Sequence, residues 1–104
     1  MTMELVDSGT TLTLHGDFDA RSTWAVRAAL LDHLAAPEHE IIVDLTDVHV
    51  IDLTALRVLA FASRTAPLTG HHVTLRGCGP SVRRMLHRSR LIRCVEVERA
   101  AASA

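Results

Sequence analysis

The sequence predicts a single α/β domain, in which an N-terminal hairpin and later parallel strands form one mixed sheet with about three helices packed on it. Short β-like runs alternate with helical runs along the chain, and strand–helix–strand alternation implies parallel crossovers. The 104 residues suffice for one domain and are too few for two ordinary ones. With 48% hydrophobic and 22% charged residues, the composition is that of a folded chain.

The N-terminal segment predicts a hairpin followed by a helix. Residues 4–15 hold an Asp-Ser-Gly turn between two β-like runs, the second of which alternates apolar and polar side chains. Asp19 or Ser22 could cap a helix that runs to about Leu34, because both residue types favour the N-cap position. Pro37 ends this helix, since proline cannot continue it.

The middle of the chain predicts a strand followed by a second helix. Residues 41–45 form a β-branched apolar run interrupted by Asp44, which favours a strand buried on both faces. Residues 48–51 continue in an extended conformation. Asp52 then opens a helix over residues 53–63.

The C-terminal third predicts a strand, a helix and a final strand. His72–Arg76 alternates polar and apolar residues as a strand does. Pro80 is expected at the first position of a helix, where its missing N–H costs nothing. Residues 92–97 predict the last strand. We expect the domain to span residues 1–99 and an Ala-rich tail at 100–104 to fray.

Composition excludes several classes of function. Aromatic residues make up 3% of the chain and the net charge is -1, so a base-stacking or strongly basic nucleic-acid surface is not expected. All eleven cationic side chains are arginine, which removes lysine chemistry such as Schiff bases. Two cysteines make no disulfide framework, and no apolar run approaches a membrane span. We expect a cytoplasmic protein with reduced thiols.

The second predicted helix carries an unusual outer face. Opposite its leucine stripe lie Thr54, Arg57, Val58, Phe61 and Arg64, at positions that a helix packed on a sheet normally gives to polar residues. Apolar anchors ringed by arginine are typical of a protein-binding patch. In the alternative interpretation, the Phe61 side packs beneath a neighbouring loop as ordinary core.

The start of the same helix offers a modification site. Thr54 follows Asp52 in the first turn, where a cap and an exposed hydroxyl are the ordinary interpretation. A helix N-terminus also accommodates a phosphate, because its free N–H groups and partial positive charge favour anions. A phosphothreonine would add about -1.5 to -2 charges to the patch and block an acidic or apolar partner.

Four segments together resemble the STAS domains of bacterial anti-sigma factor antagonists. Residues 42–48 followed by residues 51–56 resemble the family signature, an apolar strand, D-L-S-x-V, an apolar pair and D-S-S-G-L. Residues 14–19 resemble the family's L-x-G-E-L-D, and residues 75–91 its late strand, loop and third helix. The resemblance covers nearly the whole chain in order and implies the STAS fold.

The resemblance also implies a function and a site. Asp52, Thr54 and Leu56 match the Asp, the phosphoacceptor and the Leu of D-S-S-G-L, whereas Leu53 and Ala55 replace its first Ser and its Gly. An antagonist of this family captures an anti-sigma factor, typically a serine/threonine kinase, and is released when the kinase phosphorylates it. The protein would be a substrate and not an enzyme, with no cofactor.

Two other functions remain open from the sequence. The departures at Leu53 and Ala55 favour a STAS subunit that is never phosphorylated, such as the partner of a lipid transporter or a stress-signalling scaffold. A nucleotide-binding protein could instead use the loop at 77–80, which precedes an Arg-rich helix but lacks the phosphate-binding lysine motif.

The remaining polar clusters favour structural roles. The seven histidines show no metal-ligand spacing, so we expect no metal site. Asp44, Asp47 and Asp52 surround one strand-to-helix connection, where general acid/base work or Mg²⁺ binding is the alternative to capping and turn roles. The basic residues between Arg83 and Arg93 suggest either a solvated helix face or a docking surface for an acidic partner or a phosphate.

Overall fold

Five strands form one mixed sheet in the order β1-β2-β3-β4-β5. β1 and β2 pair antiparallel, and every later pair is parallel, which confirms the predicted hairpin and crossovers. The computed structural model describes residues 3–98, so the predicted boundary at residue 99 and the tail at 100–104 lie outside the described residues. The strands are β1 (Glu4–Ser8), β2 (Thr11–Phe18), β3 (Glu40–Ile51), β4 (His72–Arg76) and β5 (Glu96–Val97).

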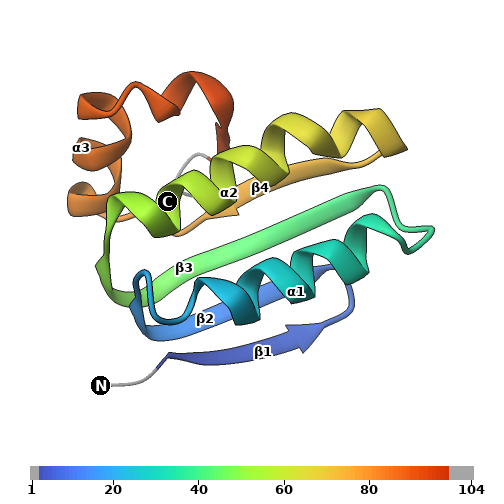
Figure 1. Cartoon of the computed structure of the whole chain (residues 1–104), viewed down its shortest axis with the longest axis horizontal. Coiled ribbons are helices and arrows are strands. Elements are labelled where there is room, and N and C mark those ends of the chain that lie inside the picture. Colours follow the sequence, from blue (N-terminus) through green and yellow to red (C-terminus); the bar gives the residue numbers. More distant parts are fainter. Residues whose placement is uncertain (1–2, 99–104) are drawn as a thin grey trace, which may run out of the picture.

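Three α-helices connect the strands of the described part. α1 and α2 lie side by side in front of the sheet, and α3 lies at the end where β4 finishes (Figure 1). Within residues 3–98, no helix is both long enough and apolar enough to cross a bilayer. The helices are α1 (Thr23–Leu34), α2 (Leu53–Thr65) and α3 (Pro80–Arg88), with 3-10 turns η1 (Ala66–Thr69) and η2 (Leu91–Cys94).

The sheet buries one face, and the prediction that β3 is buried on both faces was wrong. Ile41, Val43 and Leu45 are buried, whereas Ile42 and Asp44 between them are half-buried. The same alternation runs along β2 and β4. The physical reason is that α1 and α2 both cover the same face, so every second side chain of each strand remains partly open to water.

The opposite face of the sheet carries polar side-chain pairs near its β4–β5 edge. His72 Nε2 lies 2.8 Å from a Glu96 carboxylate oxygen, and Arg76 donates to Glu98 from Nε at 3.0 Å and from Nη2 at 3.2 Å. The hydrogen bond to Glu98 raises the pKa of the Arg76 guanidinium above its ordinary value. These pairs attach the short β5 to β4 at a polar surface.

Asp44 is satisfied within β3. Its Oδ1 accepts hydrogen bonds from the Thr46 N–H at 2.9 Å and from the Thr46 hydroxyl at 2.6 Å. Thr46 in turn lies against Gly77, which follows β4 with a φ of 73°. The end of β4 therefore approaches β3 too closely for a side chain at position 77.

The last predicted strand is largely a turn. Residues 92–97 were expected to be extended, but Leu91–Cys94 forms η2, and β5 contains Glu96 and Val97 alone. Arg90 adopts a left-handed φ of 64° after α3 and starts this turn. Leu91, Ile92 and Val95 pack against the core from the turn, so their apolar character reflects burial and not a β period.

Candidate functional site

Asp52 fixes the start of α2, as predicted for a helix cap. It has extended backbone angles, and its Oδ1 accepts a hydrogen bond from the Ala55 N–H at 2.8 Å. Its Oδ2 accepts one from the Ala20 N–H at 3.0 Å, in the loop that precedes α1. One carboxylate thereby ties the beginnings of both helices together. No hydrogen bond within residues 3–98 joins it to the Thr54 hydroxyl, so it does not orient that group.

Replacing Asp52 by alanine should destabilise the domain. The change leaves the N–H groups of Ala55 and Ala20 without their acceptor, and a lost cap of this kind costs about 1–2 kcal/mol. Urea unfolding measures the loss, and Asp52→Asn serves as the control because its amide oxygen can still accept the Ala55 bond. Equal stability of wild type and Asp52→Ala would show that the carboxylate does not connect the two helix starts.

Thr54 stands in the open at the first turn of α2. Its side chain is exposed, and its hydroxyl makes no hydrogen bond within the described residues. Ala55, which replaces the glycine of the motif, is fully buried, so its methyl group points into the domain and does not crowd a molecule that approaches Thr54. Leu53 is 37% exposed beside it. The hydroxyl is therefore free to react or to contact a partner.

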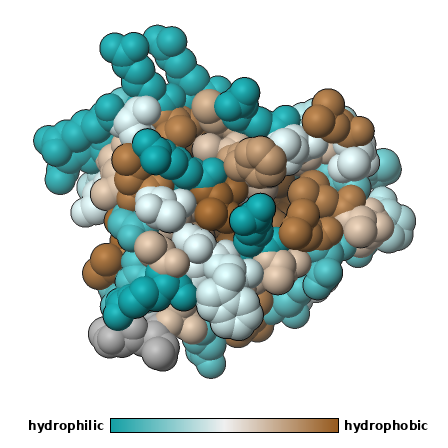
Figure 2. Space-filling view, viewed as in Figure 1, coloured by the Kyte–Doolittle hydropathy of each residue, from teal (hydrophilic) through white to brown (hydrophobic). Residues whose placement is uncertain are grey.

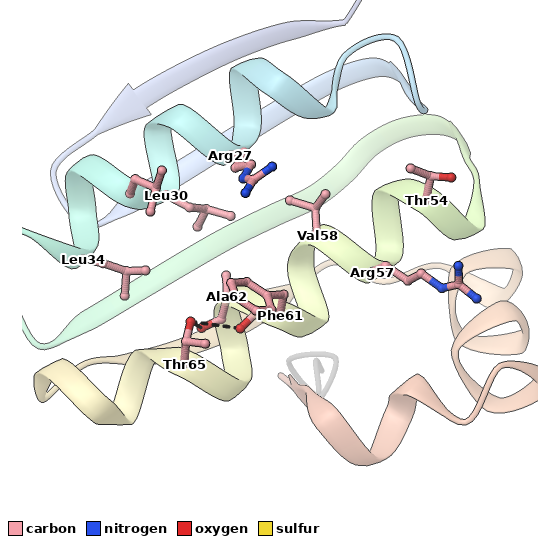
Figure 3. A pocket seen from close by; sticks show the side chains of 10 residues that line it. Arg27, Leu30, Leu34, Thr54, Arg57, Val58, Phe61, Ala62 and Thr65 are labelled. Carbon is pink, nitrogen blue, oxygen red and sulfur yellow. Dashed lines mark hydrogen bonds between the residues drawn. The ribbon is translucent and has the colours of Figure 1, made fainter.

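A groove of about 360 Å³ runs between α1 and α2. Thr54 lies at its N-terminal end, and apolar side chains from the two helices face each other along it (Figure 3). At the other end of the groove, the Thr65 hydroxyl donates a hydrogen bond to the Phe61 carbonyl at 3.0 Å, so its proton is not available to a ligand in the groove. The lining comprises Arg27, Leu30, Leu31 and Leu34 of α1 with Thr54, Arg57, Val58, Phe61, Ala62 and Thr65 of α2.

The predicted patch on α2 forms one side of this groove. Phe61 is 65% exposed, so the alternative in which it packs beneath a loop is wrong. Val58 is half-buried at the groove floor, and Arg57 lines the groove near Thr54. Arg64 is exposed but does not line it. The structure therefore brings four of the five predicted patch residues to the groove.

Helix α1 supplies the side that sequence reasoning missed. Arg27, Leu31 and Leu34 line the groove, and Leu31 is well exposed. In the space-filling view, hydrophobic and hydrophilic groups interleave over α1 and α2, and the surface is hollowed between them (Figure 2). The available signal was Leu31 itself, an apolar residue outside the buried stripe of its helix. Leu31 indicates an exposed apolar face on α1, but it does not show that this face lies opposite α2.

The other candidate clusters are occupied by structural contacts. Asp47 lies 3.2 Å from His15, and Asp44 and Asp52 bind the groups described above, so the three carboxylates share no site. Within residues 3–98, no three His, Cys, Asp or Glu side chains are placed to hold a metal ion. Burial raises the pKa of the Cys78 thiol, which keeps it protonated and unreactive.

The loop at 77–80 is filled by the protein itself. Gly77 packs on Thr46, and Arg83 donates from Nε to the Cys78 carbonyl at 3.1 Å. An arginine that a nucleotide phosphate would need is thus bonded to the loop. No feature of the described structure favours nucleotide binding there.

Comparison with known proteins identifies the family. A family model described as "Mlab, STAS domain" matches residues 1–96. The chain belongs to the STAS domain family. Among curated protein sequences none matches this STAS domain significantly.

Solved structures show the same fold at low sequence identity. The unphosphorylated anti-sigma factor antagonist SpoIIAA superposes with a TM-score of 0.70 at 14% identity, over 95% of this chain and 89% of that one. For an anti-sigma factor antagonist from Mycobacterium paratuberculosis the TM-score is 0.77 at 19% identity, over 95% and 86%. For a sulfate transporter family protein from Wolinella succinogenes it is 0.65 at 22% identity, over 84% and 73%. The same fold thus occurs in two anti-sigma factor antagonists and in a sulfate transporter family protein.

Proposed function

We propose that this STAS domain is an anti-sigma factor antagonist that captures an anti-sigma factor kinase through the α1–α2 groove and is switched off by phosphorylation at Thr54. The observation that carries the proposal is the exposed Thr54 hydroxyl at the end of an apolar, arginine-edged groove. The likeness to two anti-sigma factor antagonists supports it. The domain acts as a binding module and as a substrate, not as a catalyst.

The groove supplies the binding energy for capture. Its apolar side chains Leu31 and Phe61 are exposed to water in the free domain, and Val58 is half-buried between them. Burying apolar surface stabilises a complex by about 25 cal/mol per Å² before the costs of association, and a few such anchors dominate most interfaces. Because Arg27 and Arg57 line the edge of the groove, a complementary partner would carry acidic groups beside its apolar ones.

Phosphorylation ends the capture by a local change of charge. A phosphate on Thr54 brings about -1.5 to -2 charges to the mouth of the groove, where the proposed partner carries its own acidic groups. The first turn of α2 tolerates the phosphate, since the helix N-terminus is partially positive. The fold itself need not change, because the phosphate would lie in solvent beside an intact α2.

Intact mass measurement tests the switch. Incubation with candidate anti-sigma factor kinases and ATP is expected to add one phosphate to the wild type and none to Thr54→Ala. Thr65→Ala is a matched control, because Thr65 lines the same groove on the same helix and should leave the phosphate gain unchanged. A phosphate gained by Thr54→Ala as readily as by the wild type would place the acceptor elsewhere.

A second candidate is a STAS subunit that is not phosphorylated, for example in a transporter assembly. Two observations favour it: the matching family model is described as Mlab, and one structural neighbour is a sulfate transporter family protein. Leu53 in place of a hydroxyl residue points the same way. This candidate predicts binding through the same groove with no phosphate gained from any kinase.

A further inference from the structure

A long segment in the second half of the chain carries positive side chains but no negative ones. Residues 53–95 contain eight arginines and no aspartate or glutamate. Ten of the twelve acidic residues precede this segment, and the other two are Glu96 and Glu98. The net charge of -1 therefore conceals a strong separation of positive and negative groups within one small domain.

Five of these arginines are exposed on α3, on the segment from Arg90 through η2, and on α2. Arg84 and Arg88 lie one turn apart on the side of α3 opposite the buried Val82 and Leu86. Hydrophilic side chains protrude over this part of the molecule (Figure 2), and the Arg57 guanidinium extends from α2 toward α3 (Figure 3). We define the basic face as Arg57, Arg84, Arg88, Arg90 and Arg93.

The basic face has no internal counter-charge. None of its five guanidinium groups makes an ion pair or hydrogen bond within residues 3–98. The acidic half differs, because many of its carboxylates are used inside the domain, as with the Asp52 cap. Other such pairs are Asp7 with His33 at 2.9 Å, Asp19 with Arg21 at 2.7 Å and Asp47 with His15 at 3.2 Å.

The backbone at Arg90 supports a role for this face. Arg90 follows α3 in the left-handed region at a φ of 64°, where glycine is strongly preferred. Gly70, the residue directly after η1, has a similar φ of 76°. An arginine at such a position is strained, and its exposed side chain makes no hydrogen bond or ion pair within the described residues that would explain it. What it adds to the domain is one more positive charge beside Arg88 and Arg93.

We infer that the basic face is a second docking surface, which binds an acidic, carboxylate-rich segment of a protein partner. Charge complementarity is the argument for the occupant, since five unpaired guanidinium groups match carboxylates in paired, planar geometry. The face adjoins the apolar groove at Arg57, which also lines the groove, whereas its other four arginines lie outside the groove lining. Binding there does not require a phosphate at Thr54. It would set the orientation and the association rate of a partner held there.

An acidic segment fits this face better than an extended polyanion. The domain measures 32 × 30 × 27 Å, so a nucleic acid or a membrane would extend past the basic face, whereas a short acidic segment would not. Aromatic residues for base stacking make up only 3% of the chain. A second copy of the chain could offer only the exposed carboxylates that lack a partner within the described residues, Glu4, Asp32, Glu38 and Glu40, because the other carboxylates of the acidic half already have partners.

The test uses a labelled polyglutamate peptide of about 20 residues at about 50 mM NaCl, where the charges are only partly screened. We expect saturable binding by fluorescence anisotropy, weakened at least about tenfold at about 300 mM NaCl. The triple variant Arg84→Gln, Arg88→Gln, Arg93→Gln should weaken it at least about tenfold. Arg21→Gln, which removes an arginine outside the face, should leave the affinity within about twofold.

Arg90→Gly separates binding from folding. It should raise Tm by about 2–5 °C as the left-handed strain is relieved, and weaken peptide binding by about two- to threefold. Three results would overturn the inference. They are no saturable binding of polyglutamate, unchanged affinity of the triple variant for it, and tighter binding of an oligothymidylate of equal length or of anionic vesicles than of the peptide. Salt-sensitive self-association of the protein alone would overturn it in favour of a second copy. Phosphate gain at Thr54 is scored separately and bears only on the proposed function.

Discussion

Gly77→Ala is expected to lower the stability of the domain by roughly 2–4 kcal/mol, the largest effect of any methyl-sized change considered. In a chain of this size, that corresponds to a fall in Tm of about 10–25 °C. Thermal and urea unfolding of the two proteins measure it. The site lies outside the groove, so the loss reports on the fold and not on partner binding.

Two causes add at this position. A Cβ on Gly77 would lie 2.9 Å from both the Cα and the amide nitrogen of Thr46, closer than real Cβ contacts come. Thr46 cannot simply move away, because its N–H and hydroxyl bind Asp44 within β3. The φ of 73° adds the strain of a left-handed backbone for any residue with a side chain.

Two other glycines separate these causes. Gly79→Ala, in the same loop, meets nothing within 4 Å and has a φ of -74°, so it should cost about 0.5–1 kcal/mol as an N-cap effect. Gly70→Ala has the positive φ of 76° and open space, and should cost about 1 kcal/mol. If Gly77→Ala were no worse than Gly70→Ala, the close approach of β4 to Thr46 would be wrong.

The fold was predictable from local chemistry where one segment carried its own signal. The structure confirms the predicted hairpin and the helix starts at Asp52 and Pro80. The turn itself is Gly9-Thr10, because Asp7 and Ser8 of the predicted Asp-Ser-Gly turn belong to β1. Each of these features acts over four residues or fewer, so the sequence contains it directly.

The errors arose where the deciding interaction is distant in sequence. Residues 41–45 could not reveal that both neighbouring helices cover the same face of the sheet, because an apolar run with one acid suits either arrangement. The apolar residues within 92–97 pack against the core although most of this segment is a turn. The turn starts at Arg90, whose left-handed backbone the sequence does not reveal, because the residue there is not glycine. Tertiary packing overrode the local preference in both cases.

The same limit applies to the candidate site. A helical wheel of α2 placed Thr54, Arg57, Val58 and Phe61 on one exposed side, and the structure puts all four on the groove. The wheel could not show that Leu31 of α1 lies across from them, since that depends on how two parallel crossovers place their helices on one sheet face. The pattern of one helix thus predicts an exposed surface on that helix. The groove exists because the topology places a second helix beside it.

Phe61→Ala is expected to reduce the affinity for a captured anti-sigma factor kinase at least about 30-fold, with little change in stability. The reason is the exposure of the ring, which is 65% in the free domain and so contributes little to the core. In the complex, the ring would be buried in the α1–α2 groove and act as an anchor. Isothermal titration of the purified pair gives the affinity, and thermal unfolding of the free domain should show Tm changed by less than about 2 °C.

Leu68→Ala is the matched control, because Leu68 is 83% exposed on η1 and does not line the groove. Both substitutions remove exposed apolar surface, but only the one at Phe61 removes it from the proposed contact. A similar loss of affinity for both variants would mean that capture depends on apolar surface in general and not on the groove. A fall in Tm that accounts for the loss of affinity in Phe61→Ala would instead mean that Phe61 helps to hold α2 on the sheet. In that case the groove would have no role in capture.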